Sequence, residues 1–315
     1  MILLVVRRLL VGLLTLWAAS VLVFAGTELL PGDVATVILG QEKTPEAVAA
    51  LRAKLGLDKP APVRYIIWLT GMLQGEMGVS LVSSKPVADV IGGWVKNTFI
   101  LAGFTAAIAI PLSLILGMLS AAFPNSLLDR SISVSSLMIV SVPEFLTASV
   151  LVLLIAVQLQ ILPATSHLTT GASAAATFKA LIMPMATLTI ASLAYMTRMT
   201  RAAIMDVLRS PYVEMAVLKG VPRGRIILLH ALPNALGPIV NVVALVLGYL
   251  VSGVVVVEAV FAYPGMGRLL LDSVGLRDFP MVQSLTMLFC GFYIAINLLA
   301  DILAMLTNPK LGEEG

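Results

Sequence analysis

The chain has 315 residues, of which 59% are hydrophobic and only 12% are charged, and its formal net charge is +3. This apolar content is far above that of a water-soluble domain, so lipid must be the solvent for much of the surface. No basic run is interleaved with aromatic residues, which argues against a nucleic-acid partner. The single cysteine, Cys290, lies in an apolar stretch and can form neither an internal disulfide nor a cysteine metal site.

Six apolar stretches are long enough to cross a bilayer core, which needs about 20 residues in helical form. The sequence therefore predicts an all-α membrane protein with six transmembrane helices. The first stretch could instead be a cleaved signal peptide, but its apolar run is long and no A-x-A cleavage site follows, which favours a retained helix. The predicted spans run from Leu9 to Leu30, Thr98 to Phe123, Val134 to Leu159, Leu181 to Thr200, Ala235 to Val260 and Met281 to Leu306.

Arginine and lysine gather in the short loops on one side of the predicted spans. This side is expected to be the cytoplasm, because short cytoplasmic loops carry an excess of positive charge. The distribution predicts that both termini are cytoplasmic. The cationic residues on this side are Arg7, Arg8, Arg130, Arg198, Arg201, Arg209, Lys219, Arg223 and Arg225, against Lys179, Arg268 and Arg277 in the opposite short loops.

The long outer segment between the first two spans contains one predicted helix. Thr44 can cap it and Pro45 can occupy its first position, at the start of TPEAVAALRAKLGL. The Gly-rich stretch LTGMLQGEMGVSLVSSKPV that follows is expected to be an irregular loop or a segment lying on the membrane surface.

Motifs for catalysis and cofactor binding are missing. The chain has no phosphate-binding loop and no dinucleotide fingerprint, so any ATP and magnesium would be bound elsewhere. His167 and His230 are predicted on opposite membrane faces and lack metal-ligand spacing. The sequence therefore predicts no catalytic residue, no metal site and no bound cofactor, although an intramembrane enzyme or a non-transporting scaffold stays open as a weaker alternative.

The cytoplasmic segment between the fourth and fifth spans has the pattern of a two-helix lever. In SPYVEMAVLKGVPRGRIILLHALPNALGPI, Ser210 can cap a short helix and Pro211 can occupy its first turn. Gly220 can end this helix in the left-handed conformation, and Pro222 cannot continue the ladder. One face of the short helix is formed by Val213, Ala216 and Val217.

This segment resembles the signature of binding-protein-dependent ABC permeases, which is EAA, three residues, Gly, nine residues, then Ile-x-Leu-Pro. Two positions depart from the pattern, Met215 and His230. The resemblance implies a coupling helix that docks in a groove of a cytoplasmic ATPase, whereas the alternative is a solvated loop with incidental helix. The matching residues are Glu214, Ala216, Gly220, Leu232 and Pro233, and the residues implied in coupling are Tyr212, Val213, Glu214, Ala216, Gly220 and Pro233.

Further stretches resemble the B-type permease subunit of the dipeptide, oligopeptide and nickel branch. They are RRLLVGLLTLWAASVLVFAGTELLPGD, GLDKPAPVRYIIWLTGMLQGEMGVSLVSSKPV and VVVVEAVFAYPGMGRLLLDSV. The resemblance implies an inner-membrane importer built from two different permeases, two ATPases and a periplasmic solute-binding protein. It divides the chain into an N-terminal helix with its periplasmic segment (1–93), a type I permease domain (94–306) and a cytoplasmic tail (307–315).

One carboxylate, Glu144, is predicted near the middle of the third span beside Pro143. An ionised group there must face a cavity, a partner or a counter-charge. It could line the pore and meet cationic groups, or it could make a hydrogen-bonded contact between helices. The rival function is an ion-coupled secondary transporter in which Glu144 or Asp301 carries protons, and uptake that survives ATP depletion would favour it. Glu258 is expected near water at the outer end of its span and has no predicted role.

Overall fold

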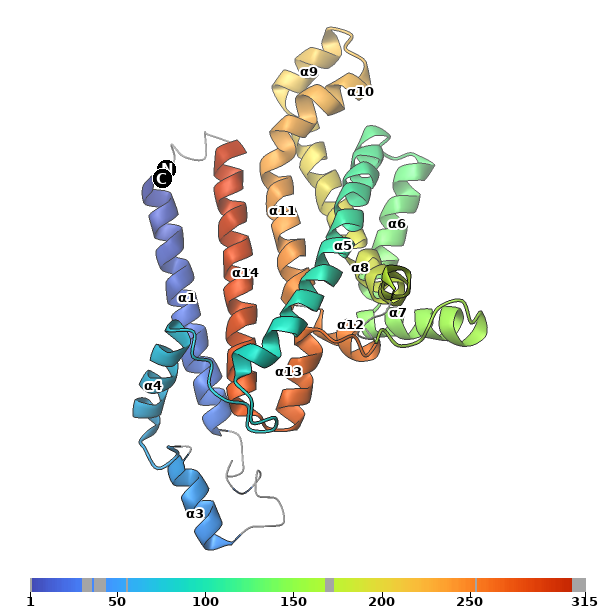
Figure 1. The fold of residues 1–315 in the computed structure, drawn as a ribbon. Coiled ribbons are helices and arrows are strands. Elements are labelled where there is room, and N and C mark those ends of the chain that lie inside the picture. The colour runs from blue at the N-terminus through green and yellow to red at the C-terminus, as the bar shows by residue number, and fades with distance from the viewer. Residues whose placement is uncertain are drawn as a thin grey trace.

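The computed structural model describes residues 2–29, 36, 44–54, 56–167, 173–252 and 254–307, and within these ranges the chain is all-helical. The only strand-like pairing among the described residues is an isolated bridge between Val79 and Pro86. Long helices run side by side along the molecule (Figure 1). Five helical stretches have the length and hydropathy to cross a membrane, and a bent pair of helices adds a sixth candidate. The predicted fold class is confirmed. The principal helices of the five stretches are α1 (Ile2–Leu29), α5 (Val87–Ala122), α8 (Ala174–Leu208), α11 (Leu232–Ser252) and α14 (Phe279–Thr307).

The third predicted span is not one straight helix. It consists of α6 (Leu127–Ser141) followed by α7 (Glu144–Leu151) and the π-helical segment η1 (Val152–Gln158), and the two halves are bent by 99°. The bend falls at Val142 and Pro143, where a proline ring disfavours helical backbone in the preceding residue. Figure 1 shows α7 turning away from the direction of α6. Glu144 is therefore the first residue after a corner, which differs from its expected place inside a continuous helix.

Two of the spanning helices are much longer than their apolar stretches. α5 has 36 residues and begins before the expected Thr98, and α8 has 35 residues and begins before Leu181. At 1.5 Å per residue each is about 50 Å long, compared with a bilayer core of about 30 Å. Both helices are therefore longer than the apolar stretches that hydropathy identified, and their N-terminal turns were missed.

The fifth predicted span is also divided. Before α11 the chain forms α10 (Arg223–Arg225) and the π-helical segment η2 (Ile226–Ala231). After Ser252 the outer end of the predicted span is a separate short helix, α12 (Val255–Val260), and α13 (Met266–Gly275) follows it.

Residues 44–54 and 56–73 of the outer segment contain two helices, of which one was predicted. α3 (Pro45–Lys54) is the predicted helix, and the Thr44 hydroxyl accepts from the Ala47 amide at 3.2 Å as a cap. α4 (Ala61–Leu73) was not predicted, and its last turns occupy the start of the expected irregular loop. Pro60 and Pro62 set its first turn, because proline is pre-organised for a helix N-terminus.

Buried residues form a main core and a smaller one. The main core joins α5, α8, α11 and α14 through fully buried side chains that include Leu101, Leu188, Leu250 and Leu285. Close contact between α5 and α8 depends on Gly117, since a Cβ there would lie 2.7 Å from Thr200 Cβ. The smaller core lies nearer the end that carries α9 (Pro211–Leu218), and its buried members are Ala121, Ile204, Ala231, Ala235 and Ile239.

Candidate functional site

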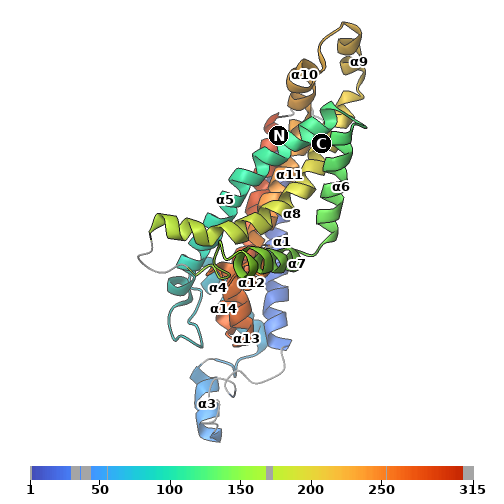
Figure 2. The same cartoon turned by 90° about the vertical axis from the view of Figure 1, so that its right-hand side faces the viewer.

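The segment from Pro211 to Arg225, here called the elbow, projects beyond the ends of the long helices (Figures 1 and 2). Pro211 occupies the first turn of α9 as predicted. Gly220 has φ +75°, and the Val221 amide donates to the Ala216 carbonyl at 3.1 Å, so the predicted left-handed helix stop is confirmed. Ser210 occupies the N-cap position of α9 as predicted, but its hydroxyl donates to the Val207 carbonyl at 2.5 Å and makes no capping bond to the helix.

The side chains of α9 divide into an inner anchor and an outer surface. Val213 is 1% exposed and anchors the helix, whereas Val217, expected on the same face, is 57% exposed. Ala216 is half-buried and Glu214 is exposed. The exposed large apolar side chains, here called the elbow surface, are Tyr212, Met215, Val217 and Leu218.

The elbow is tied to the start of the fifth span. The Tyr212 hydroxyl donates to the His230 carbonyl at 3.2 Å, and Asn234 Nδ2 donates to the same oxygen at 2.7 Å. Pro233 lies one residue inside α11, directly after the π-helical turn of η2, and it does not break the helix. A widened turn is one of the arrangements that accommodate a residue without an amide hydrogen.

A charged cluster fixes the base of the elbow. Arg201 of α8 donates from Nε (2.7 Å) and Nη2 (2.9 Å) to the two carboxylate oxygens of Asp129 in α6. The Ser120 hydroxyl and the Asn125 amide also donate to this carboxylate. Bidentate arginine pairs have strict geometry, so this cluster holds the turn between α5 and α6 against α8. The sequence analysis treated Arg201 only as one of the cytoplasmic loop charges and did not identify Asp129. The feature that could have identified Asp129 is that it is a single acidic residue in a loop expected to be cationic.

The bend between α6 and α7 opens a cavity of about 330 Å³. Glu144 is its only charged lining residue, and its side chain is half-buried. The remaining lining residues come from the end of α6, from Val142 at the bend, from α8 and from α11. Glu144 thus shares a cavity with residues of α6, α8 and α11.

At the opposite end of the molecule from the elbow, Glu258 is the organising residue of the turn between α12 and α13. It is fully buried, and its carboxylate accepts from Thr98 Oγ1 (2.7 Å), the Gly267 amide (2.7 Å) and the Arg268 amide (3.2 Å). The expectation of a water-exposed carboxylate without a role is wrong. A carboxylate at the N-terminus of α13 satisfies amides that have no partner within the helix. The sequence feature that could have indicated this role is Pro-Gly-x-Gly, because a glycine is needed where the backbone approaches the carboxylate. A Cβ on Gly265 would lie 1.9 Å from Glu258 Oε1.

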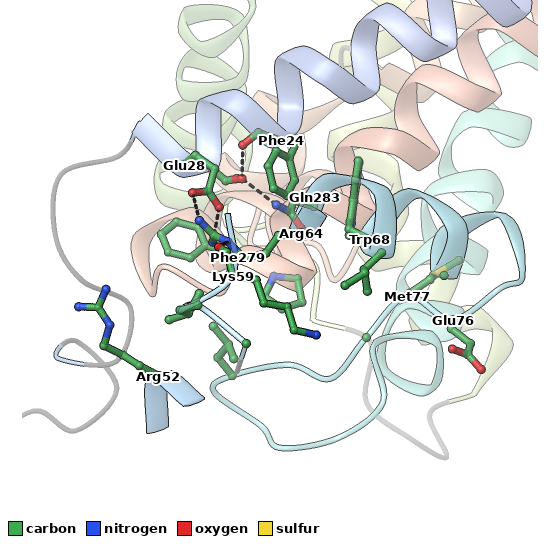
Figure 3. Close-up of a pocket in the computed structure, with 18 residues that line it drawn as sticks. Phe24, Glu28, Arg52, Lys59, Arg64, Trp68, Glu76, Met77, Phe279 and Gln283 are labelled. Carbon is green, nitrogen blue, oxygen red and sulfur yellow. Dashed lines mark hydrogen bonds and ion pairs between the residues drawn. The ribbon is translucent and has the colours of Figure 1, made fainter. Parts of the chain in front are cut away.

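A second, larger cavity of about 610 Å³ lies at this outer end, between α1, α4 and the start of α14 (Figure 3). Arg64 donates to both carboxylate oxygens of Glu28 at 2.6 Å, and Gln283 Nε2 donates to Thr27 Oγ1 at 2.7 Å. The ring of Trp68 lies 5.8 Å from that of Phe24. These contacts join the first helix to the outer segment and to α14, and sequence reasoning did not find them.

No group of three or more histidine, cysteine, aspartate or glutamate side chains able to hold a metal ion occurs in the described part of the chain. The geometry instead consists of an exposed apolar elbow, a cavity at a helix bend, and a locked outer turn.

Comparisons with known proteins agree with this arrangement. Residues 113–313 match the model of the binding-protein-dependent transport system inner membrane component, and residues 1–102 match the model of the N-terminal part of such membrane components. The chain is 40% identical over 309 residues, 97% of each chain, to the glutathione transport system permease protein GsiC of Pectobacterium atrosepticum. It is 37% identical to the protein of that name from Escherichia coli K12 and 32% identical to the probable peptide ABC transporter permease protein y4tP of Sinorhizobium fredii, with 98% of each chain covered. The chain therefore belongs to the family of binding-protein-dependent transport system inner membrane components, multi-pass permease subunits whose ATP hydrolysis is carried out by partner subunits.

Proposed function

We propose that this chain is one of two homologous permease subunits of an importer for peptides or peptide-like solutes such as glutathione, and that its elbow docks onto a cytoplasmic ATPase. The cargo class follows from the names of the relatives, which are glutathione and peptide permeases. Two ATPases and a periplasmic binding protein complete the assembly. The permease domain corresponds to residues 94–306.

The observation that carries this proposal is the elbow surface. Four large apolar side chains are 46% to 75% exposed on a helix of eight residues that projects beyond the bundle. Exposed apolar groups gathered at one site mark interaction surfaces. A short helix lying in a groove of a partner is an ordinary mode of recognition.

The stiffness of the elbow supports mechanical coupling. Val213 anchors α9 from below, Gly220 sets the sharp reversal, and Pro233 begins the helix that returns into the membrane. Glu214 is exposed beside the elbow surface, and Tyr212 is part of that surface, so a partner can reach both. Small Ala216 lets the partner approach the helix closely.

The orientation proposed is with the elbow and both termini in the cytoplasm. The first residues of α1 and the last residues of α14 lie at the same end as the elbow (Figure 1). This end carries most of the arginine residues of the short loops, in accord with the positive-inside rule. The cavity of Figure 3 then faces the side from which a binding protein delivers cargo.

A cysteine cross-linking experiment tests the docking. In a Cys290→Ser background, Leu218→Cys and Met215→Cys are expected to cross-link to the co-expressed ATPase through a short bismaleimide. Leu29→Cys is the matched control, because Leu29 is 82% exposed and lies at the outer end of α1. Cross-linking from Leu29→Cys, or its absence from both elbow positions in an assembled complex, would contradict the proposal.

A further inference from the structure

The cavity at the bend between α6 and α7 has one charged group in a mostly apolar wall. Glu144 begins α7 at the corner. The volume of about 330 Å³ is at the lower end of the range of small-molecule sites. The apolar part of the wall is formed by Ile139, Val140, Val142, Ala191, Leu245 and Val246.

Two hydroxyl groups of the cavity lack a partner in the described part of the chain. Ser192 is 2% exposed, and its Oγ makes no hydrogen bond there. The Tyr249 hydroxyl is also buried without a partner. Buried polar groups in proteins are nearly always hydrogen-bonded, so two hydroxyl groups without a partner on residues that line one cavity are exceptional. Both oxygens are closed to solvent, so each can accept from a ligand only after its side chain turns toward the cavity.

The charge of the cavity is equally uncompensated. No hydrogen bond or ion pair of the Glu144 side chain is present among the described residues, and the cavity contains no lysine or arginine. A carboxylate within a membrane-spanning segment requires a counter-charge or water. Tyr195 and Tyr249 line the same cavity, and aromatic rings attract cations.

A primary ammonium group satisfies these features together. It carries one positive charge for Glu144 and three N–H donors, which the carboxylate can accept directly and the two hydroxyl groups can accept once they turn toward the cavity. We infer that this cavity binds the ammonium group of the cargo as the cargo passes through the permease. The inference rests on the proposed function, because peptides and glutathione both carry a free amino group.

Charge-selective labelling tests whether the cavity is open to water and favours cations. Val142 lines the cavity and is 40% exposed, so Val142→Cys in a Cys290→Ser background supplies the target thiol. The assembled complex in membrane vesicles is treated from each side with a trimethylammonium-ethyl or a sulfonato-ethyl methanethiosulfonate. Val63→Cys in α4, 43% exposed, gives the reference ratio of the two rates.

The cationic reagent is expected to be favoured at Val142→Cys by about tenfold over the reference ratio. Adding Glu144→Gln should abolish this preference, whereas Glu46→Gln, a matched change on the exposed surface of α3, should leave it intact. An unreactive thiol at position 142, or an equal ratio with and without the Glu144 carboxylate, would overturn the inference.

Protection by small amines tests the ligand class. L-alanyl-L-alaninamide, which has an ammonium group and no carboxylate, is expected to slow labelling of Val142→Cys, and its N-acetyl derivative is not. Equal protection by both compounds, or protection by hydrated Mg²⁺ alone, would overturn the ammonium assignment. These outcomes are separate from the docking test, because loss of the Leu218→Cys cross-link would contradict the proposed function while leaving the labelling ratio unchanged.

Discussion

The fifth crossing ends in two connections that are built in opposite ways. In the outer turn, Glu258, Phe261 and Tyr263 are fully buried, whereas in the elbow Leu218 is 75% exposed and Val217 is 57% exposed. The outer turn satisfies its polar groups inside the chain, as the Tyr263 hydroxyl does by donating to the Asn97 carbonyl at 2.8 Å. The elbow instead leaves large apolar side chains exposed. The difference separates a turn whose contacts lie within the chain from one that, under the proposed function, is covered only when the ATPase docks.

Burial also changes the chemistry of the outer turn. The loss of hydration together with the nearby Glu258 carboxylate raises the pKa of the Tyr263 hydroxyl above its ordinary value. The hydroxyl therefore stays protonated and keeps donating to Asn97 at any physiological pH. This bond joins the outer turn to the start of the apolar part of α5.

The largest effect is expected from removing the Glu258 carboxylate. Glu258→Ala leaves the Thr98 hydroxyl and two backbone amides without an acceptor, and each stranded donor costs about 1–3 kcal/mol. We expect a loss of more than about 3 kcal/mol in the free energy of unfolding, read as a lower denaturation temperature of the purified complex. Glu258→Gln keeps one carbonyl acceptor and should lose much less. Equal stability of Glu258→Ala and wild type would contradict the network.

A single added methyl group is the next way to break the outer turn. The Cβ of Gly265→Ala would lie 1.9 Å from Glu258 Oε1, so the carboxylate must leave its hydrogen bonds or the turn must shift. Overpacking of this kind costs about 1–3 kcal/mol. Gly275→Ala is the matched control, because nothing lies within 4 Å of its Cβ position. The comparison fails if both variants denature at the same temperature.

In the elbow the expected effect is on coupling more than on stability. Gly220→Val forces a β-branched residue into φ +75°, a local strain of about 1–3 kcal/mol that disfavours the helix stop. We expect normal membrane insertion with a large loss of ATP-driven uptake. Gly224→Val, at a position with open space and no left-handed backbone, should transport better than Gly220→Val. Uptake by Gly220→Val at the wild-type rate would contradict the proposal that the elbow couples the ATPase to transport.

The smallest effect is expected from Glu214. Its side chain is exposed, so reversing its charge in Glu214→Lys should leave the permease itself stable. Docking of the ATPase should weaken by about 1 kcal/mol, roughly a fivefold loss in co-purified ATPase at limiting concentration. Glu46→Lys on α3 is the control for added positive charge, because α3 lies at the end opposite to the elbow. Unchanged recovery of the ATPase with Glu214→Lys would exclude this residue from the interface.

The spans were predictable from sequence, but their ends and bends were not. Hydropathy reports the residues in contact with lipid or core, so it found the apolar part of α5 and missed the turns from Val87 onward. Pro143 signalled a kink, yet the angle of 99° depends on the packing of α7 against α8 and α12. Local signals therefore located the apolar stretches, whereas tertiary contacts determine where each helix ends and bends.

The residues of the candidate site also divide into those that local sequence preferences predict and those that depend on tertiary contacts. Gly220 could be predicted because left-handed backbone is a local preference of glycine. The roles of Glu258 and of the pair Asp129–Arg201 could not be predicted, because each depends on a contact between residues that are 70 or more positions apart in sequence. These contacts join Thr98 to Glu258 and Asp129 to Arg201. A buried carboxylate is defined by the donors that the fold delivers to it, which spacing alone does not reveal.

The first helix is fastened near both of its ends. Arg8 pairs with Asp301 of α14 near the termini, and at the other end Thr27 receives Gln283 of α14 while Glu28 holds Arg64 of α4. Because α1 contacts α14 near both of its ends, it cannot rotate about a single contact with α14. During a transport cycle α1 and α14 should consequently move together as one rigid body. The distance between a spin label on α1 and one on α14 should then keep a single narrow distribution whether nucleotide is bound or absent.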